Sequence, residues 1–271
     1  MMSLPGIFSS LEQVQLIVFV AALAMARALG LMLLMALFTR IRMTGLLRNG
    51  VALAFSIPLF PPLIEIVRTT DMTAAMVVTL AFKELLVGAA LGFAMSIPFL
   101  AAEAAGDIVD LQRGVTMGSL IDPMITRETS ATGTLFGIII ATIFLSLGGL
   151  ATTLDILYKS YQIWPAEQFS PIFSRDSVEI FLDLMTAILV MAISIAFPLI
   201  AGLLLSDILL AFISRAAPHL NVFALSLIAK SLVYSLMLVL YATFLLTYLK
   251  GELSFFNEVS RFLEDASCRA C

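Results

Sequence analysis

Six long apolar runs, separated by more polar stretches, dominate the pattern along the chain. They cover residues 11–38, 51–67, 73–100, 130–150, 178–213 and 222–249. A helix needs roughly 17–25 mostly apolar residues to cross the hydrocarbon core of a bilayer. The pattern therefore predicts an all-α integral membrane protein with about six hydrophobic helical segments.

Two of these runs depart from a straight span. Residues 178–213 are too many for one upright helix, so the run predicts either a tilted helix or two half-helices broken near Pro198. Residues 51–67 are few and include Pro58 and the pair Pro61-Pro62. Proline removes a helical hydrogen bond and bends the axis. We therefore expect several kinked or broken helices.

Composition and charge support the same class. The chain is 61% apolar and 13% charged, whereas a soluble domain is about 45–50% apolar and about 25% charged. Arg40, Arg42 and Arg48 follow the first apolar run, which by the positive-inside rule places that loop in the cytoplasm. No basic stripe with interleaved aromatic residues is present, so we expect no nucleic-acid partner.

The polar stretch 101–128 lies between two apolar runs and is the first place to look for function. It contains Gly106, Gly114, Gly118 and Pro123, residue types that permit or fix turns. Most connections need only about 4–6 residues, and long loops between rigid elements often carry function. We therefore expect a specialised loop here.

The remaining organisation divides the chain at residue 249. Residues 1–249 are expected to form one helical unit, in which 151–177 is a connector on the periplasmic side. Residues 250–271 are expected to form a short polar or amphipathic tail. This tail ends in a lone C-x-x-C, Cys268 and Cys271, and the single histidine, His219, is distant in sequence, so we predict no metal site and no cofactor.

Several ionisable residues fall inside or near the ends of apolar runs: Arg27, Lys83, Glu84, Asp207 and Lys230. Charges at membrane depth are costly and normally face a partner or water. Lys83 and Glu84 are adjacent, so on one helix their side chains point roughly 100° apart. Each is expected to find a partner elsewhere. A static ion pair, the lining of a polar conduit and a contact with a neighbouring subunit all stay open.

Two G-x-x-x-G patterns, at Gly88 and Gly92 and at Gly133 and Gly137, predict close helix packing.

Catalytic motifs are missing from the sequence. One histidine cannot form H-E-x-x-H, and no G-x-S-x-G elbow or phosphate-binding loop occurs. We therefore predict a protein that is not an enzyme.

Three sequence blocks together resemble a known family. They are Lys83-Glu84-Leu-Leu-Val-Gly88 with Gly92-Phe93, Ala105-Gly106-Asp-Ile-Val-Asp-Leu-Gln112-Arg-Gly114 with Asp122-Pro123, and Arg215-Ala-Ala-Pro218-His-Leu-Asn221-Val-Phe223 with Leu225-Ser226 and Lys230-Ser231. Their order and spacing resemble the SctT family, the T subunit of the type III secretion export apparatus, whose flagellar counterpart is FliR. The third block is more similar to injectisome members than to flagellar ones.

The resemblance implies a core subunit of the type III export gate in the bacterial inner membrane. A single copy would assemble with several R and S subunits, near the switch subunit SctU, and the gate would pass unfolded secreted proteins. The helices would fold as bent hairpins packed in this hetero-oligomeric gate.

The resemblance also implies a plug that closes the pore after the Leu-Gln-x-Gly element. Carried onto this chain, the plug residues are Gln112, Gly114, Val115, Met117, Gly118, Leu120, Ile121, Asp122 and Pro123. The alternative is an ordinary cytoplasmic connector, in which Asp107, Asp110 and Arg113 would be solvated.

The third block predicts a turn between the last two helices, built from Arg215, Pro218, Asn221 and Phe223. Pro218 would fix the bend, and the Asn221 side chain would cap the final helix.

From a different functional class, a polytopic small-molecule or ion transporter stays open as the alternative. An intramembrane enzyme is the weakest possibility, because catalytic groups are missing.

Overall fold

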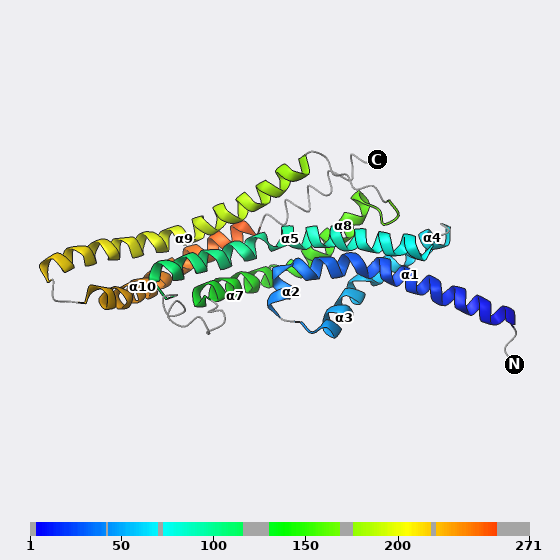
Figure 1. Ribbon diagram of the computed structural model, residues 1–271, viewed down its shortest axis with the longest axis horizontal. Helices are drawn as coiled ribbons and strands as arrows, with labels where there is room; N and C mark the ends of the chain where they lie inside the picture. Colours follow the sequence, from blue (N-terminus) through cyan, green and yellow to red (C-terminus); the bar gives the residue numbers. More distant parts are fainter. Residues whose placement is uncertain are drawn as a thin grey trace. The chain divides into compact units, whose positions relative to one another are not determined.

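The computed structural model describes residues 4–41, 43–69, 73–115, 130–168, 176–217 and 221–253. Within these residues all regular structure is helical, as the apolar runs predict (Figure 1). The helices are α1 (Leu4–Leu34), α2 (Ala36–Arg40), α3 (Gly45–Ser56), the 3₁₀ helix η1 (Ile57–Leu59), α4 (Phe60–Thr69), α5 (Ala74–Arg113), α7 (Ala131–Ser146), α8 (Gly149–Ile163), α9 (Asp176–Ala216) and α10 (Val222–Glu252).

Five helical segments in the described residues are long and apolar enough to cross a membrane. They are Gln13–Leu34, Gly45–Thr69, Ala74–Arg113, Met185–Ala216 and Ala224–Gly251. Helices α7 and α8 add a sixth if the two count as one broken span. The break falls at Gly148, whose φ of 79° is rarely adopted by other residues. The chain is thus a multi-pass membrane protein with about six hydrophobic segments, some of them broken, as predicted.

Two segments that were expected to be loops are partly helical. The polar stretch 101–128 was expected to be a loop, but α5 continues to Arg113, because Ala101, Ala105 and Val109 repeat at helical spacing and are buried. In the expected connector 151–177, residues 151–163 belong to helix α8. Of the two alternatives for residues 178–213, the single long helix is the one observed, because α9 runs without a break through Pro198, which a membrane helix tolerates.

The chain divides into two compact units. Unit 1 comprises Met1–Ser96, Gly149–Arg175 and Phe256–Cys271, and unit 2 comprises Ile97–Gly148 and Asp176–Phe255. Helix α5 contributes to both units. The predicted boundary between a helical part and a tail at residue 249 stays a prediction, because residues 254–271 lie outside the described part.

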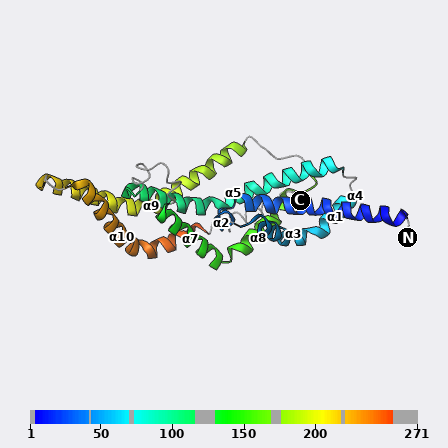
Figure 2. The same ribbon diagram turned by 60° about the horizontal axis from the view of Figure 1, so that its bottom comes forward.

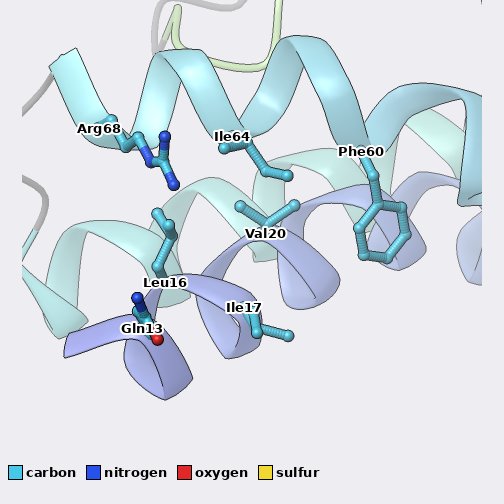
Figure 3. Close-up of a pocket in the computed structure, with 7 residues that line it drawn as sticks. All are labelled: Gln13, Leu16, Ile17, Val20, Phe60, Ile64 and Arg68. Atoms are coloured by element: carbon cyan, nitrogen blue, oxygen red, sulfur yellow. The ribbon is translucent and has the colours of Figure 1, made fainter. Parts of the chain in front are cut away.

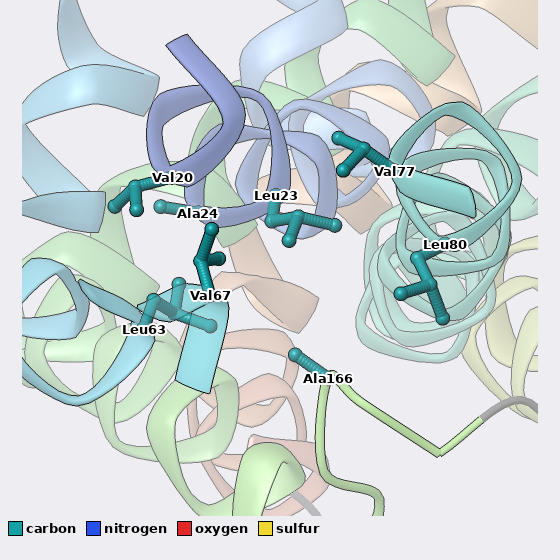
Figure 4. Close-up of a cluster of buried hydrophobic side chains, with 8 residues drawn as sticks. All are labelled: Val20, Leu23, Ala24, Leu63, Val67, Val77, Leu80 and Ala166. Carbon is teal, nitrogen blue, oxygen red and sulfur yellow. The ribbon is translucent and has the colours of Figure 1, made fainter. Parts of the chain in front are cut away.

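In unit 1, α1 packs against α3 and α4. Helices α1, α4 and the first part of α5 surround an apolar core (Figure 4). The core side chains are Val20, Leu23, Ala24, Leu63, Val67, Val77, Leu80 and Ala166. The turn η1 contains Pro58 and lets α3 and α4 follow α1 as one kinked segment. The irregularity expected in residues 51–67 is present as this 3₁₀ turn.

Close backbone contact joins α1 to α5 in unit 1. A Cβ atom added to Gly88 would overlap the backbone oxygen of Arg27, and one added to Gly92 would overlap that of Leu31. Gly30 on α1 faces the Leu85 carbonyl in the same way. The contacting positions rise together along both helices, so α1 and α5 run parallel, and the first G-x-x-x-G pattern marks their contact.

In unit 2, α9 and α10 form an antiparallel hairpin (Figures 1 and 2). The Tyr241 hydroxyl donates to the Ile195 carbonyl at 3.2 Å. Helix α7 lies along the second part of α5, where Phe99 and Phe144 meet edge to face with 5.3 Å between ring centres. Gly106 and Gly133 bring these two backbones together, since a Cβ on Gly106 would overlap Gly133.

Candidate functional site

A glycine-based cap ends α5 at the start of the predicted plug segment. Gly114 has φ 80°, and its N–H donates to the Leu111 carbonyl at 3.1 Å. The Val115 N–H donates to the Asp110 carbonyl at 3.3 Å. This pair of bonds is a Schellman motif, which needs a left-handed residue after the helix. Gly114 therefore sets the direction in which the chain leaves α5.

The Asp110 carboxylate joins the two ends of the stretch 116–129. It is 1% exposed. Its Oδ2 atom accepts from Ser130 Oγ at 2.7 Å and from the Thr132 N–H at 3.0 Å. Its Oδ1 atom accepts from Thr132 Oγ1 at 2.6 Å and from Arg113 Nη1 at 2.9 Å. We call Asp110, Arg113, Ser130 and Thr132 the Asp110 clamp.

Tyr234 on α10 extends the clamp to a third helix. Its hydroxyl lies 2.9 Å from Thr132 Oγ1, and it donates this bond because the single Thr132 proton goes to Asp110. The Arg113 guanidinium lies 4.0 Å from the centre of the Tyr234 ring, a cation–π contact. The clamp therefore holds the end of α5 to both α7 and α10.

A second polar group fixes the last turn of α5 to the α9–α10 hairpin. Lys230 Nζ lies 2.8 Å from Asp207 Oδ1 and donates to the Gln112 carbonyl at 3.1 Å. Gln112 Nε2 donates to Asp207 Oδ2 at 3.3 Å. Helix ends leave carbonyls without intrahelical partners, and a lysine satisfies one here. Asp207 and Lys230 thus partner each other within unit 2.

A buried ion cluster lies in unit 1. Arg27 and Glu84 have side chains 0% exposed and form a two-pronged contact, Nε to Oε2 at 2.6 Å and Nη2 to Oε1 at 3.0 Å. Lys83 Nζ lies 2.6 Å from Glu84 Oε1. Glu84 thus has the expected partner elsewhere, in Arg27. Lys83 and Glu84 also pair with each other, which was not expected, because the long lysine stem carries its ammonium group back to the neighbouring carboxylate.

The two cations of this cluster also bind α8 and the chain that follows it. Arg27 donates to Ser160 Oγ and to the Trp164 carbonyl, both at 2.9 Å. Lys83 donates to three further carbonyls, those of Pro165 at 3.2 Å, Ala166 at 3.1 Å and Gln168 at 3.1 Å. Glu84 keeps no exposed surface for a neighbouring subunit. Glu84 therefore forms a buried ion cluster within unit 1.

The other predicted residues lie as follows. Asn221 precedes α10 and its side chain accepts from the Ala224 N–H at 3.2 Å, which caps the helix. Arg215 is exposed in the last turn of α9, and Phe223 belongs to α10. Gly133 and Gly137 are buried in α7. Outside the described residues lie Met117, Gly118, Leu120, Ile121, Asp122, Pro123 and Pro218.

Sequence reasoning missed most of the Asp110 clamp. Asp110 and Arg113 entered only as residues of a solvated connector, whereas the structure buries the Asp110 carboxylate. Ser130 stands just before an apolar run, a readable N-cap signal, and its Oγ accepts from the Gly133 N–H at 2.8 Å. Nothing in the sequence pairs Thr132 with Tyr234.

In the described part of the chain no group of His, Cys, Asp or Glu could hold a metal ion.

Comparison with known proteins identifies the relatives of the chain. Residues 18–255 match the family described as bacterial export proteins, family 1. The chain is 40% identical over 201 residues to Yop proteins translocation protein T of Yersinia pestis, covering 72% of this chain and 75% of that protein. It is 33% identical over 224 residues to secretion system apparatus protein SsaT of Salmonella typhimurium, covering 81% of this chain and 85% of that protein. It is 29% identical over 185 residues to flagellar biosynthetic protein FliR of Bacillus subtilis, covering 68% of this chain and 71% of that protein.

The helical fold, the membrane spans and these relatives together define a membrane protein of a bacterial protein-export apparatus. The chain belongs to the bacterial export proteins, family 1. The predicted resemblance to the SctT family of type III secretion is confirmed, and the higher identities to secretion proteins than to FliR favour the injectisome form. The transporter alternative is not supported. None of the three names above describes an enzyme.

Proposed function

We propose that this chain is the single T subunit of a type III export gate in the bacterial inner membrane. It assembles with several R and S subunits, with the switch subunit SctU nearby, and the gate passes unfolded secreted proteins. Family membership supports this proposal, as do the printed names of relatives that concern translocation of Yop proteins and a secretion system apparatus. The chain acts by assembly and gating.

The gating element in this proposal is the segment 112–123. The Asp110 clamp carries the proposal, because it joins the α5 end of the segment to Ser130 and Thr132 on the far side. A segment tied at both ends to packed helices returns to one closed position after it has been displaced. Val115, Met117, Leu120 and Ile121 supply apolar side chains that exclude water and ions from a closed pore.

The charges named from the sequence have supporting roles in this proposal. Arg27, Lys83 and Glu84 hold residues 164–168 against α1 and α5. Asp207 and Lys230 hold the end of α5 against the α9–α10 hairpin. Both groups hold helix α5 in place, and the gating segment starts at the end of this helix.

Native mass spectrometry of the tagged chain, expressed together with its R and S partners, tests the assembly. We expect a stable complex that contains one copy of this chain and several R and S subunits. A monomer or homodimer that ignores those partners would contradict the proposed gate. The same preparation is then used for conductance measurements on the gating segment, so assembly and closure are scored separately.

A further inference from the structure

A groove between α1 and α4 in unit 1 takes no part in the proposed gating. Its volume is about 240 Å³. The lining side chains are Gln13, Leu16, Ile17 and Val20 from α1 and Phe60, Ile64 and Arg68 from α4 (Figure 3). Because the two helices run antiparallel here, residues early in α1 lie opposite residues late in α4.

The polar and apolar lining residues of this groove are segregated. Arg68 and Gln13 lie toward one end, with Leu16 between them in the view, and Phe60 lies at the other (Figure 3). Between these ends the lining is aliphatic, from Ile17, Val20 and Ile64. The groove therefore has an apolar body with a cation and an amide at one end.

The polar end lies at the edge of the membrane-spanning segments. Arg68 is the penultimate residue of the candidate span Gly45–Thr69, and Gln13 lines the same end of the groove from α1. The ends of such spans meet the boundary between hydrocarbon and headgroups, where arginine directs its guanidinium toward the interface. Val20 and Phe60 lie further into the spans, at the depth of acyl chains.

Arg68 is exposed and has the capacity to bind an anion. Among the described residues, no hydrogen bond or ion pair involves its guanidinium, and Glu65, one turn earlier on α4, forms no ion pair with it. A guanidinium offers paired N–H donors that match two phosphate oxygens. The Gln13 amide at the same end of the groove adds a further donor.

We propose that this groove binds an anionic phospholipid. The phosphate lies against Arg68 and Gln13, and one acyl chain follows Leu16, Val20 and Ile64 toward Phe60. Charge complementarity favours this occupant, since an apolar helix of another protein would leave the cation without a counterion. A second groove in unit 2, lined only by the apolar Leu135, Ile139, Leu238, Val239, Ala242, Leu245 and Leu246, offers no such headgroup contact.

Native mass spectrometry from nanodiscs tests the lipid site on the chain in the complex with which it purifies. The nanodiscs contain equal amounts of phosphatidylglycerol, which is anionic, and phosphatidylcholine, which is zwitterionic. We expect the complex to retain phosphatidylglycerol preferentially. Arg68→Gln should lower that preference about fivefold, the equivalent of about 1 kcal/mol for one basic residue at a membrane surface. Arg215→Gln, which changes another exposed arginine, is the matched control and should leave it unchanged.

A second variant tests the apolar body of the groove. Ile64→Trp places a bulky ring in the groove and should lower retention of phosphatidylglycerol while the subunit composition stays constant. An unchanged lipid preference in Arg68→Gln would overturn the proposal, and so would a partner subunit that cross-links to position 68 and excludes lipid. The spectra report subunit composition and bound lipid separately, so failure of the lipid site is distinguishable from failure of the export-gate assembly.

Discussion

Ser130 donates a 2.7 Å hydrogen bond to Asp110 although the two residues are twenty positions apart in sequence. The bond closes the base of the stretch 116–129 and leaves both flanking helices in fixed positions. The same carboxylate accepts from the backbone and side chain of Thr132. A single buried acid therefore joins the end of α5 to the start of α7.

Replacing Asp110 with asparagine should loosen the clamp. The amide nitrogen would face donors where a carboxylate oxygen now accepts, and hydrogen bonds to a charged group contribute about 1.5–3 kcal/mol each. We expect Asp110→Asn to lower the melting temperature of the purified complex. In the proposed gate it should also let ions leak, which membrane conductance measures.

Asp155→Asn provides the control for that experiment. Asp155 pairs with Lys159 at 2.7 Å on the surface of α8, and its side chain is 46% exposed. Exposed pairs of this kind contribute about 0–1 kcal/mol, so melting and conductance should both stay near those of the unchanged protein. Equal conductance in the Asp110 and Asp155 variants would argue against a positioning role for the clamp.

The sequence predicts the helical spans well and the polar contacts poorly, for a physical reason. Spans follow from local runs of apolar residues, and the Asn221 cap follows from residue type just before a run. The Asp110 carboxylate, by contrast, is satisfied by Ser130, Thr132 and, through Thr132, by Tyr234 on α10. These partners are brought together only by packing, so no local pattern marks them.

Helix length in α5 illustrates the same limit. Polarity and glycine predicted a loop from residue 101, yet the helix ends only at Gly114. The helix continues because Gly106 allows α7 to approach and Asp110 finds buried partners. Tertiary contacts thus add to the helical spacing of the buried Ala101, Ala105 and Val109.

Deleting residues 115–121 tests the proposed plug. The deletion spares the Asp110 clamp and the G-x-x-x-G contacts, so the R and S subunits should still assemble with the chain. It removes the apolar side chains that would seal the pore, and we therefore expect ions to leak across the membrane. Normal assembly together with unchanged conductance would rule out the plug assignment.

The buried cluster in unit 1 should be sensitive to loss of its carboxylate. Glu84→Gln leaves Arg27 and Lys83 buried without a counter-charge, and breaking a buried pair in this way costs about 3–5 kcal/mol. We expect the variant to accumulate poorly and to unfold at a much lower temperature. Thermal unfolding of the purified complex measures the effect.

Asp207→Asn is the comparison for the Glu84 variant. Asp207 also pairs with a lysine, but its side chain is 35% exposed, and such pairs contribute about 1 kcal/mol or less. The melting temperature of the Asp207→Asn complex should therefore fall much less than that of the Glu84→Gln complex. A similar loss in both variants would mean that burial does not decide the strength of these ion pairs.

Close packing of α1 on α5 predicts the effect of adding a single methyl group. In Gly88→Ala the new Cβ would overlap the Arg27 carbonyl, so the two backbones must separate. Overpacking of this kind costs about 1–3 kcal/mol, and the shift also strains the Arg27–Glu84 contact one turn away. Gly50→Ala, with nothing within 4 Å of the added atom, should instead be neutral or stabilise α3 by about 0.5–1 kcal/mol. Thermal unfolding of both variants measures the difference, and a Gly88 variant as stable as the Gly50 variant would contradict the packing of α1 on α5.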